Sequence, residues 1–220
     1  MTESASADEV TRQLRQWEER LWRRDRASVS YLRPGLTRAQ VDATAAEHGI
    51  RLPDDAAAVW MWHDGERATP EGAGPVRSVF PGGGIFLSLH SSLAQSRWLE
   101  QITFDGEDDG DYSDEEDFSE RRGRPVQFYF RRGFVLLSYA EYATYLDCTD
   151  PDVGCTPTAG FSTWSDTSTQ QVPLAERIAG WNRAWDAGVW PEAPANWATV
   201  DEEAAERLFG HGPHVRHRLK

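Results

Sequence analysis

The sequence predicts a single α+β domain, in which a mainly antiparallel sheet packs with an N-terminal helical hairpin and with C-terminal helices. Helical patterns fill the first third of the chain, adjacent strand patterns follow between 76 and 164, and helical periodicity returns after Pro173. A chain of 220 residues buries roughly 70% of the surface that its unfolded form exposes, which suits one domain with a sizeable core. The ten tryptophans are expected to supply much of that core.

The N-terminal part is expected to be disordered over residues 1–7 and helical from about Asp8 to Arg26. Apolar residues in this helix recur at intervals of four, three and four, and therefore share one face: Val10, Leu14, Trp17 and Leu21. The opposite face is crowded with Arg and Glu. A loop through Leu32 to Gly35 then leads to a second helical region.

Two short helices joined by a tight turn are expected between Thr37 and Gly65. Thr37 and Gln40 have the spacing of a capping box at the start of the first helix. Gly49 supplies the left-handed conformation that ends it, and Leu52 fills the gap between the helices. Pro53 is favourable where the second helix starts, because its missing N–H would have no partner there.

The second helix of this hairpin is predicted to bury a large aromatic face. Asp54 and Asp55 place negative charge on its first turn, where the helix dipole favours it. The face that we expect to be buried, and the two residues that we expect to end the helix, are Val59, Trp60, Trp62 and His63, then Asp64 and Gly65. Trp62, Trp98 and Trp190 are equally compatible with lining a recognition groove.

The segment after the hairpin is predicted to contain a turn-rich excursion over 66–74 and two strands, Val76–Phe80 and Ile85–Leu89. The glycines between these strands precede no Gly-Lys-Ser/Thr, so a strand connection is favoured over a phosphate site. A helix capped by Ser91 or Ser92 is expected to run to about Ile102.

An acidic run over 105–120 holds ten carboxylates and no Lys or Arg, and accounts for all but three units of the formal net charge of −13. Proteins that bind nucleic acid need a basic stripe, so this charge argues against them and favours a basic protein partner. We expect the run to be a solvated loop, with two interpretations open: low-specificity solubility, or electrostatic docking. The docking surface would comprise Asp108, Asp109, Asp111, Tyr112, Asp114, Glu115, Glu116, Asp117 and Phe118.

Part of the same run approaches the pattern of a calcium-binding loop. Asp105, Glu107, Asp109 and Glu116 lie near the ligand positions of the twelve-residue loop, but Glu107 stands where Asp or Asn is preferred. The exit helix is broken by the arginines and glycine of 121–125, and no second loop pairs with this one. We therefore predict no metal and no cofactor.

The second half of the chain alternates strand and helix signals. Strands are predicted at 126–130, 134–138 and 161–164, a loop at 150–160, and either a strand or a short helix at 142–147. Pro173 opens a helix that Gly188 closes. A proline-rich link leads from 191 to a last helix, capped by Thr199 with Glu202, and to a loose tail ending at 220.

Several functional classes are disfavoured by the sequence. No run of 18 apolar residues and no signal peptide is found, so we expect a cytoplasmic protein without membrane association. Cys148 and Cys155 fit neither a zinc framework nor a redox pair. No nucleophile elbow, zinc helix or dinucleotide fingerprint occurs, and the spaced histidines 211, 214 and 217 are interrupted by Gly and Pro, so we expect no enzyme.

The order of residues in the hairpin resembles the SUKH superfamily, which groups bacterial toxin-immunity proteins with fungal regulators of cell-wall synthesis. An Ala/Glu-rich helix is followed by Gly49-Ile-x-Leu-Pro53 and an aromatic helix that ends in Asp64-Gly65. Further similar positions are Trp17, Leu21, Leu32, Pro34, Gly35, Tyr145, Leu146, Asp147, Asp150, Pro151, Gly154, Trp164, Trp185 and Gly188. The resemblance covers roughly residues 10 to 190, within a domain expected over 8–190.

The resemblance implies a non-catalytic protein-binding module. It would be an immunity protein that neutralises a toxin, for example a nuclease, by covering a basic active site. The alternative is a cytoplasmic adaptor or regulator that binds a cellular protein, as in the fungal branch. The sequence leaves the partner and the oligomeric state open.

Overall fold

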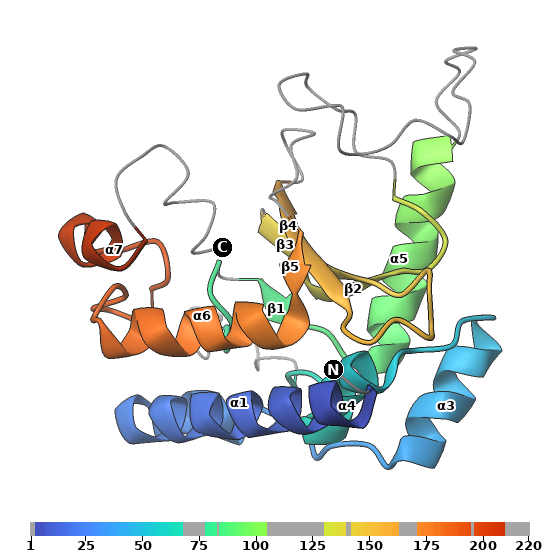
Figure 1. Cartoon of the computed structure of the whole chain (residues 1–220), viewed down its shortest axis with the longest axis horizontal. Coiled ribbons are helices and arrows are strands. Elements are labelled where there is room, and N and C mark those ends of the chain that lie inside the picture. The colour runs from blue at the N-terminus through green and yellow to red at the C-terminus, as the bar shows by residue number, and fades with distance from the viewer. Residues whose placement is uncertain are drawn as a thin grey trace.

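The computed structural model describes residues 3–67, 78–82, 84–104, 130–139, 142–162, 171–194 and 196–209. The helices in these residues are α1 (Glu3–Arg24), α2 (Arg26–Ser30), α3 (Arg38–Glu47), α4 (Asp54–Trp62), α5 (Leu89–Phe104), α6 (Leu174–Asp186) and α7 (Glu202–Phe209). The strands are β1 (Ile85–Phe86), β2 (Phe134–Tyr139), β3 (Tyr142–Asp147), β4 (Pro157–Ser162) and β5 (Val172–Pro173). This arrangement confirms the predicted α+β class (Figure 1).

The five strands form one antiparallel sheet in the order of the chain, β1-β2-β3-β4-β5. Alternate residues of β2 pack on opposite faces of this sheet. Val135 and Leu137 join the main core with the helices, whereas Phe134 and Leu136 join a smaller core. In the smaller core the ring of Phe134 stacks on Tyr145 at a centroid distance of 4.7 Å. Strand β2 is therefore buried on both faces.

Helix α5 closes the edge of β2 where the two-residue strand β1 ends. Phe86 pairs with Ser138, and the Leu87 amide donates to the Leu137 carbonyl. At the next residue the Ser92 hydroxyl donates to the Leu136 carbonyl, and the Leu136 amide donates to Ser96 Oγ at 3.0 Å. Two serine side chains of α5 thus make the main-chain bonds that β1 would make to β2 if it were longer.

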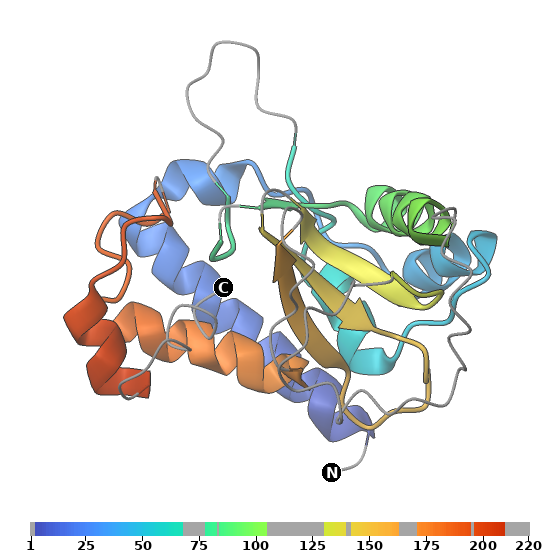
Figure 2. The same cartoon turned by 90° about the horizontal axis from the view of Figure 1, so that it is seen from above.

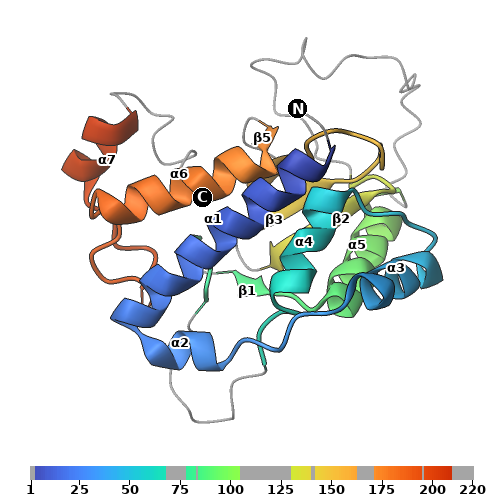
Figure 3. The ribbon, with the colours of Figure 1, turned by 60° about the horizontal axis from the view of Figure 1, so that its bottom comes forward.

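The main core lies between the sheet and the helices α1, α4 and α6. Figures 1 and 3 show α1 and α6 side by side, and α4 beside the N-terminal half of α1. The predicted apolar stripe of α1 is completely buried. Trp17 is at its centre, and four further rings lie with centroids 5.3–6.4 Å from it: Trp181, Trp185, Trp190 and Trp197.

The predicted helical hairpin is present as α3 and α4. Thr37 and Gln40 form both bonds of the capping box, and Gly49 has a φ of +68°. Pro53 occupies the N-cap of α4. Gly65 also has a positive φ, and a Cβ there would lie 2.3 Å from the Ser88 amide nitrogen. The residues predicted to cap, turn or end the helices therefore occupy those positions in the structure.

The hairpin is attached to the β1 end of the sheet. The Trp60 indole is buried and donates to the Leu87 carbonyl at 3.1 Å. The Glu66 amide donates to the Phe86 carbonyl, and Glu66 also forms an isolated bridge with Leu32. Figure 2 shows α3 and α5 grouped beyond one side of the sheet, with α7 on the opposite side of the molecule.

Three predictions in the first half differ from the structure. Residues 1–7 were expected to be disordered, but α1 begins at Glu3, and the buried Ser6 hydroxyl of its first turn donates to Asp55 on α4 at 3.1 Å. The described part of the predicted strand 76–80 forms bends. Its main chain bonds to side chains instead: the Val79 amide donates to Glu66, and the Trp17 indole donates to the Val79 carbonyl. The strand predicted at 85–89 ends at Phe86.

Further differences concern the second half. Residues 142–147, for which two structures were open, form β3, and β4 begins at Pro157 inside the predicted loop. Asp201 caps α7, since its carboxylate accepts the Ala204 amide, whereas Thr199 donates to Glu192. A carboxylate adjacent to the first turn is the stronger cap. The strand predicted at 126–130 and Trp164 lie outside the described residues, apart from Phe130.

Candidate functional site

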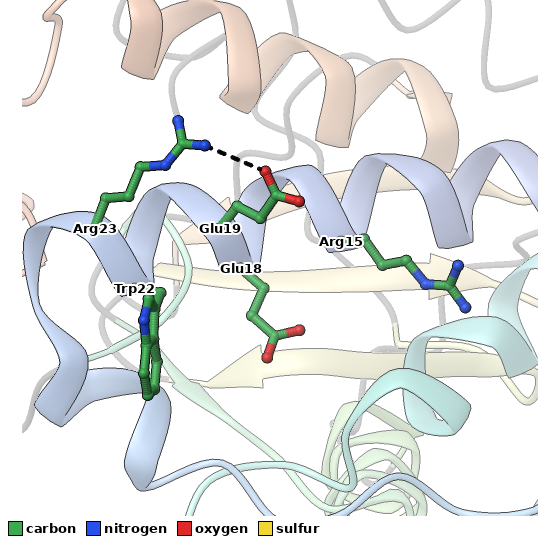
Figure 4. A pocket seen from close by; sticks show the side chains of 5 residues that line it. All are labelled: Arg15, Glu18, Glu19, Trp22 and Arg23. Atoms are coloured by element: carbon green, nitrogen blue, oxygen red, sulfur yellow. Dashed lines mark ion pairs between the residues drawn. The ribbon is translucent and has the colours of Figure 1, made fainter.

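A shallow hollow of about 330 Å³ lies on the outer face of α1. Five residues from this helix line it: Arg15, Glu18, Glu19, Trp22 and Arg23. Their spacing of three, four, seven and eight residues puts them on one side of the helix. Figure 4 shows Glu18 and Trp22 extending from the same side of α1, with Arg15 toward α4 and Arg23 directed at Glu19.

The hollow lies on a helix whose opposite face is fixed. Val10, Leu14, Trp17 and Leu21 have no exposed surface. Additional links hold α1 to the C-terminal part of the chain, because the Arg20 guanidinium binds both oxygens of Asp186 at 2.5 and 2.9 Å. The side chains that line the hollow therefore lie on a rigid helix. This reduces the conformational entropy that is lost when a ligand binds.

Glu18 is held in place by the end of the helical hairpin. The Trp62 indole donates to Glu18 Oε2 at 2.8 Å, and His63 Nε2 lies 3.5 Å from Oε1. The hydrogen bond from His63 lowers the pKa of the Glu18 carboxyl, burial acts in the opposite direction, and the bond from Trp62 lowers it further. The Glu18 side chain keeps 32% of its surface exposed. A fixed, ionised carboxylate therefore forms the floor of the hollow.

His63 is itself positioned by the main chain. Its Nδ1 lies 2.7 Å from the Arg33 carbonyl oxygen, and its ring meets Trp62 edge to face at 4.5 Å. Both ring nitrogens thus face oxygen atoms, Nδ1 the Arg33 carbonyl and Nε2 the Glu18 carboxylate. His63 was expected in the buried face of the second helix, but it lies just after α4 and is only partly buried.

Trp22 is the aromatic group of the hollow and is 48% exposed. The Arg26 guanidinium lies over its ring, 5.4 Å from the centroid. Arg23 and Glu19 form a loose ion pair of 3.6 Å, and both side chains are more than two-thirds exposed. The hollow thus combines an accessible aromatic face with charges of both signs, a composition found at protein interfaces.

The predicted docking residues 108–118, the calcium-like loop and the histidines at 211, 214 and 217 lie outside the described residues. Of the tryptophans left open, Trp62 donates to Glu18 of the hollow, Trp190 is buried, and Trp98 is 48% exposed on α5. The hollow was not predicted from the sequence, because the outer face of α1 has the Arg and Glu composition of an ordinary charged surface. Trp22 was the available signal, since it is a large aromatic residue outside the apolar stripe.

Other reactive groups in the described residues do not converge on the hollow. Both cysteines are free thiols, and burial raises the pKa of Cys148 well above its usual range. Over the described ranges, no three His, Cys, Asp or Glu side chains are grouped so that they could hold a metal ion. None of the helices described there has the length and apolar character needed to cross a bilayer. Comparison of the chain with models of protein families and with curated proteins found no match in either.

Proposed function

We propose that the protein is a non-catalytic binding module whose partner is a basic protein, and that the partner is a toxin that it neutralises. The observation that carries the binding function is Trp22, an exposed aromatic residue in a charged hollow on a helix whose other face is buried. Tryptophan and arginine are enriched among the residues that dominate binding energy at protein interfaces.

The charge of the chain supports a basic partner. The formal net charge is −13, and the acidic run over 105–120 contains most of it. A field of this sign accelerates the approach of a positively charged protein, and the effect weakens as salt is added. A toxin that cleaves nucleic acid needs a basic groove, so an acidic protein is suited to block it.

The toxin assignment is supported by the resemblance of the helical hairpin to SUKH proteins. The residues that carry this resemblance have defined local roles: Gly49 ends α3, Pro53 precedes α4 and Gly65 allows close packing on Ser88. The adaptor function stays the alternative within the same class of binding proteins.

Capture followed by co-expression tests the proposal. The purified protein is immobilised, a native-host extract is applied at low salt, and captured proteins are identified by mass spectrometry. We expect a basic protein that arrests growth when expressed alone and is harmless when co-expressed with this chain. A captured partner without toxicity would favour the adaptor, and failure to retain any basic protein at low salt would contradict the binding function.

A further inference from the structure

We infer that the hollow on α1 receives an arginine side chain of the partner protein, an inference that rests on the proposed binding function and makes it specific. The planar cation would lie against the exposed Trp22 ring, and its N–H groups would donate to Glu18 and Glu19. Three observations favour this occupant: the cation already on Trp22, the fixed Glu18 carboxylate and the negative net charge of the chain as a whole.

The Trp22 ring already binds a guanidinium group. Arg26 lies 5.4 Å from the ring centroid, and 48% of the Trp22 surface is still exposed. Cations are attracted to the face of an indole more strongly than to other aromatic rings, and arginine makes such contacts more often than lysine. The geometry around Trp22 therefore suits a second planar cation.

The carboxylates supply the acceptors that a guanidinium needs. Glu18 uses one bond from Trp62 and one from His63, while a carboxylate offers about four acceptor positions. Glu19 is 68% exposed and is held by Arg23 only at 3.6 Å. An incoming arginine can therefore bond to Glu18 and replace the loose pair at Glu19, with a forked geometry that lysine lacks.

Charge complementarity decides between a cationic and an anionic occupant. Arg15 and Arg23 could attract a carboxylate, but the chain as a whole carries a formal charge of −13. An acidic partner would be repelled on approach, whereas a basic partner is attracted. Arginine satisfies both the local acceptors and the long-range field.

Titration of the ¹⁵N-labelled full chain with three capped tripeptides tests the inference. The probes are acetyl-Gly-Arg-Gly-amide, the same peptide with uncharged citrulline, and the same peptide with Glu. We expect the arginine peptide alone to produce saturable shifts of the Trp22 indole N–H signal and of the α1 amides between 15 and 23. The Trp22→Phe variant assigns the indole signal.

Matched variants connect the shifts to the hollow. Trp22→Ala should abolish the saturable shifts of the α1 amides, and combined Glu18→Gln and Glu19→Gln should weaken arginine-peptide binding about fivefold, the effect of losing exposed charge pairs. Trp98→Ala removes an equally exposed tryptophan from α5 and should leave binding unchanged. Circular dichroism confirms that each variant is folded.

The inference is overturned if the arginine peptide gives no saturable shift at Trp22, if citrulline or Glu peptides bind as well, or if the variants of the hollow bind normally. These outcomes are separate from the test of the general function. A toxic partner that is captured equally well by wild type and Trp22→Ala would retain the binding function and reject the hollow as its arginine site.

Discussion

The two faces of α1 use tryptophan in opposite ways. Trp17 on the inner face is completely buried, donates to the Val79 carbonyl at 2.9 Å and lies among four other indoles. Trp22, five residues later, is half exposed and is surrounded by charged side chains of the same helix. The inner ring therefore stabilises the fold, whereas the outer ring is available for binding.

The largest expected effect is a difference in unfolding free energy between variants of these two rings. Trp17→Ala should lower the free energy of unfolding by about 3–5 kcal/mol, because it leaves a cavity in the core and removes the bond to Val79. Trp22→Ala is the matched control and should cost less than about 1 kcal/mol. Urea unfolding of both variants measures the difference. Equal losses would show that the division between the faces is wrong.

A second effect distinguishes buried from exposed carboxylates. Burial raises the pKa of Glu66 to about 7 from 4.5, although its carboxylate accepts the Val79 and Phe86 amides. Between pH 4.5 and 7 the folded protein therefore binds more protons than the unfolded chain, so the contribution of Glu66 to stability falls as the pH rises. The fall is at most about 3 kcal/mol.

Glu66→Gln tests this pH dependence, because the amide oxygen can still accept both main-chain bonds. The difference in unfolding free energy between variant and wild type should move in favour of the variant as the pH rises from 4.5 to 7. It should then stay constant. A difference that does not vary with pH would mean that Glu66 is ionised throughout this range.

The contribution of Glu18 in the hollow to stability should change with pH in the opposite sense to that of Glu66, and by less. Its pKa is lowered, so its contribution is present above pH 4.5 and is lost as the pH falls through the lowered value. Because the side chain is partly exposed, we expect only a few tenths of a kcal/mol. Glu18→Gln should reduce stability slightly at pH 7 and not at the acid limit, as measured by urea unfolding.

The smallest effect on stability is expected for the acidic run, whose role would be in association. Five serine substitutions should slow binding of a captured basic partner and flatten its salt dependence, while unfolding stays unchanged: Asp108, Asp109, Asp114, Glu115 and Glu116. Stopped-flow association at several salt concentrations measures this. A control with the same change in charge replaces exposed residues elsewhere: Asp8, Glu47, Asp152, Glu176 and Glu203. If both variants slow association equally, only the total charge matters.

The structural features that were predicted correctly are those determined by residues close together in the sequence. The Thr37–Gln40 capping box, the end of α3 at Gly49 and the buried stripe of α1 all follow from spacing within a few residues. The segment around Val79 was mispredicted because its partners are distant: Glu66, Trp17 and Trp197 take its main-chain groups. Such contacts leave no periodic pattern.

The candidate site was harder to predict for a related reason. The five lining residues are adjacent on α1 and could have been grouped from sequence, but Glu18 is held by residues outside this helix. Trp62 and His63 come from 44 or more residues away and fix Glu18 from below. Sequence spacing indicates which side chains share a helix face, whereas the support beneath them depends on the tertiary fold.

The serines of α5 have a consequence for how any partner can attach. Since Ser92 and Ser96 occupy the carbonyl and amide of Leu136, this border of the sheet offers no vacant main-chain groups at that residue to a visiting peptide. A strand from another chain cannot be added there without displacing a helix. A partner that contacts α5 at this point would therefore meet its side chains and not the main chain of Leu136.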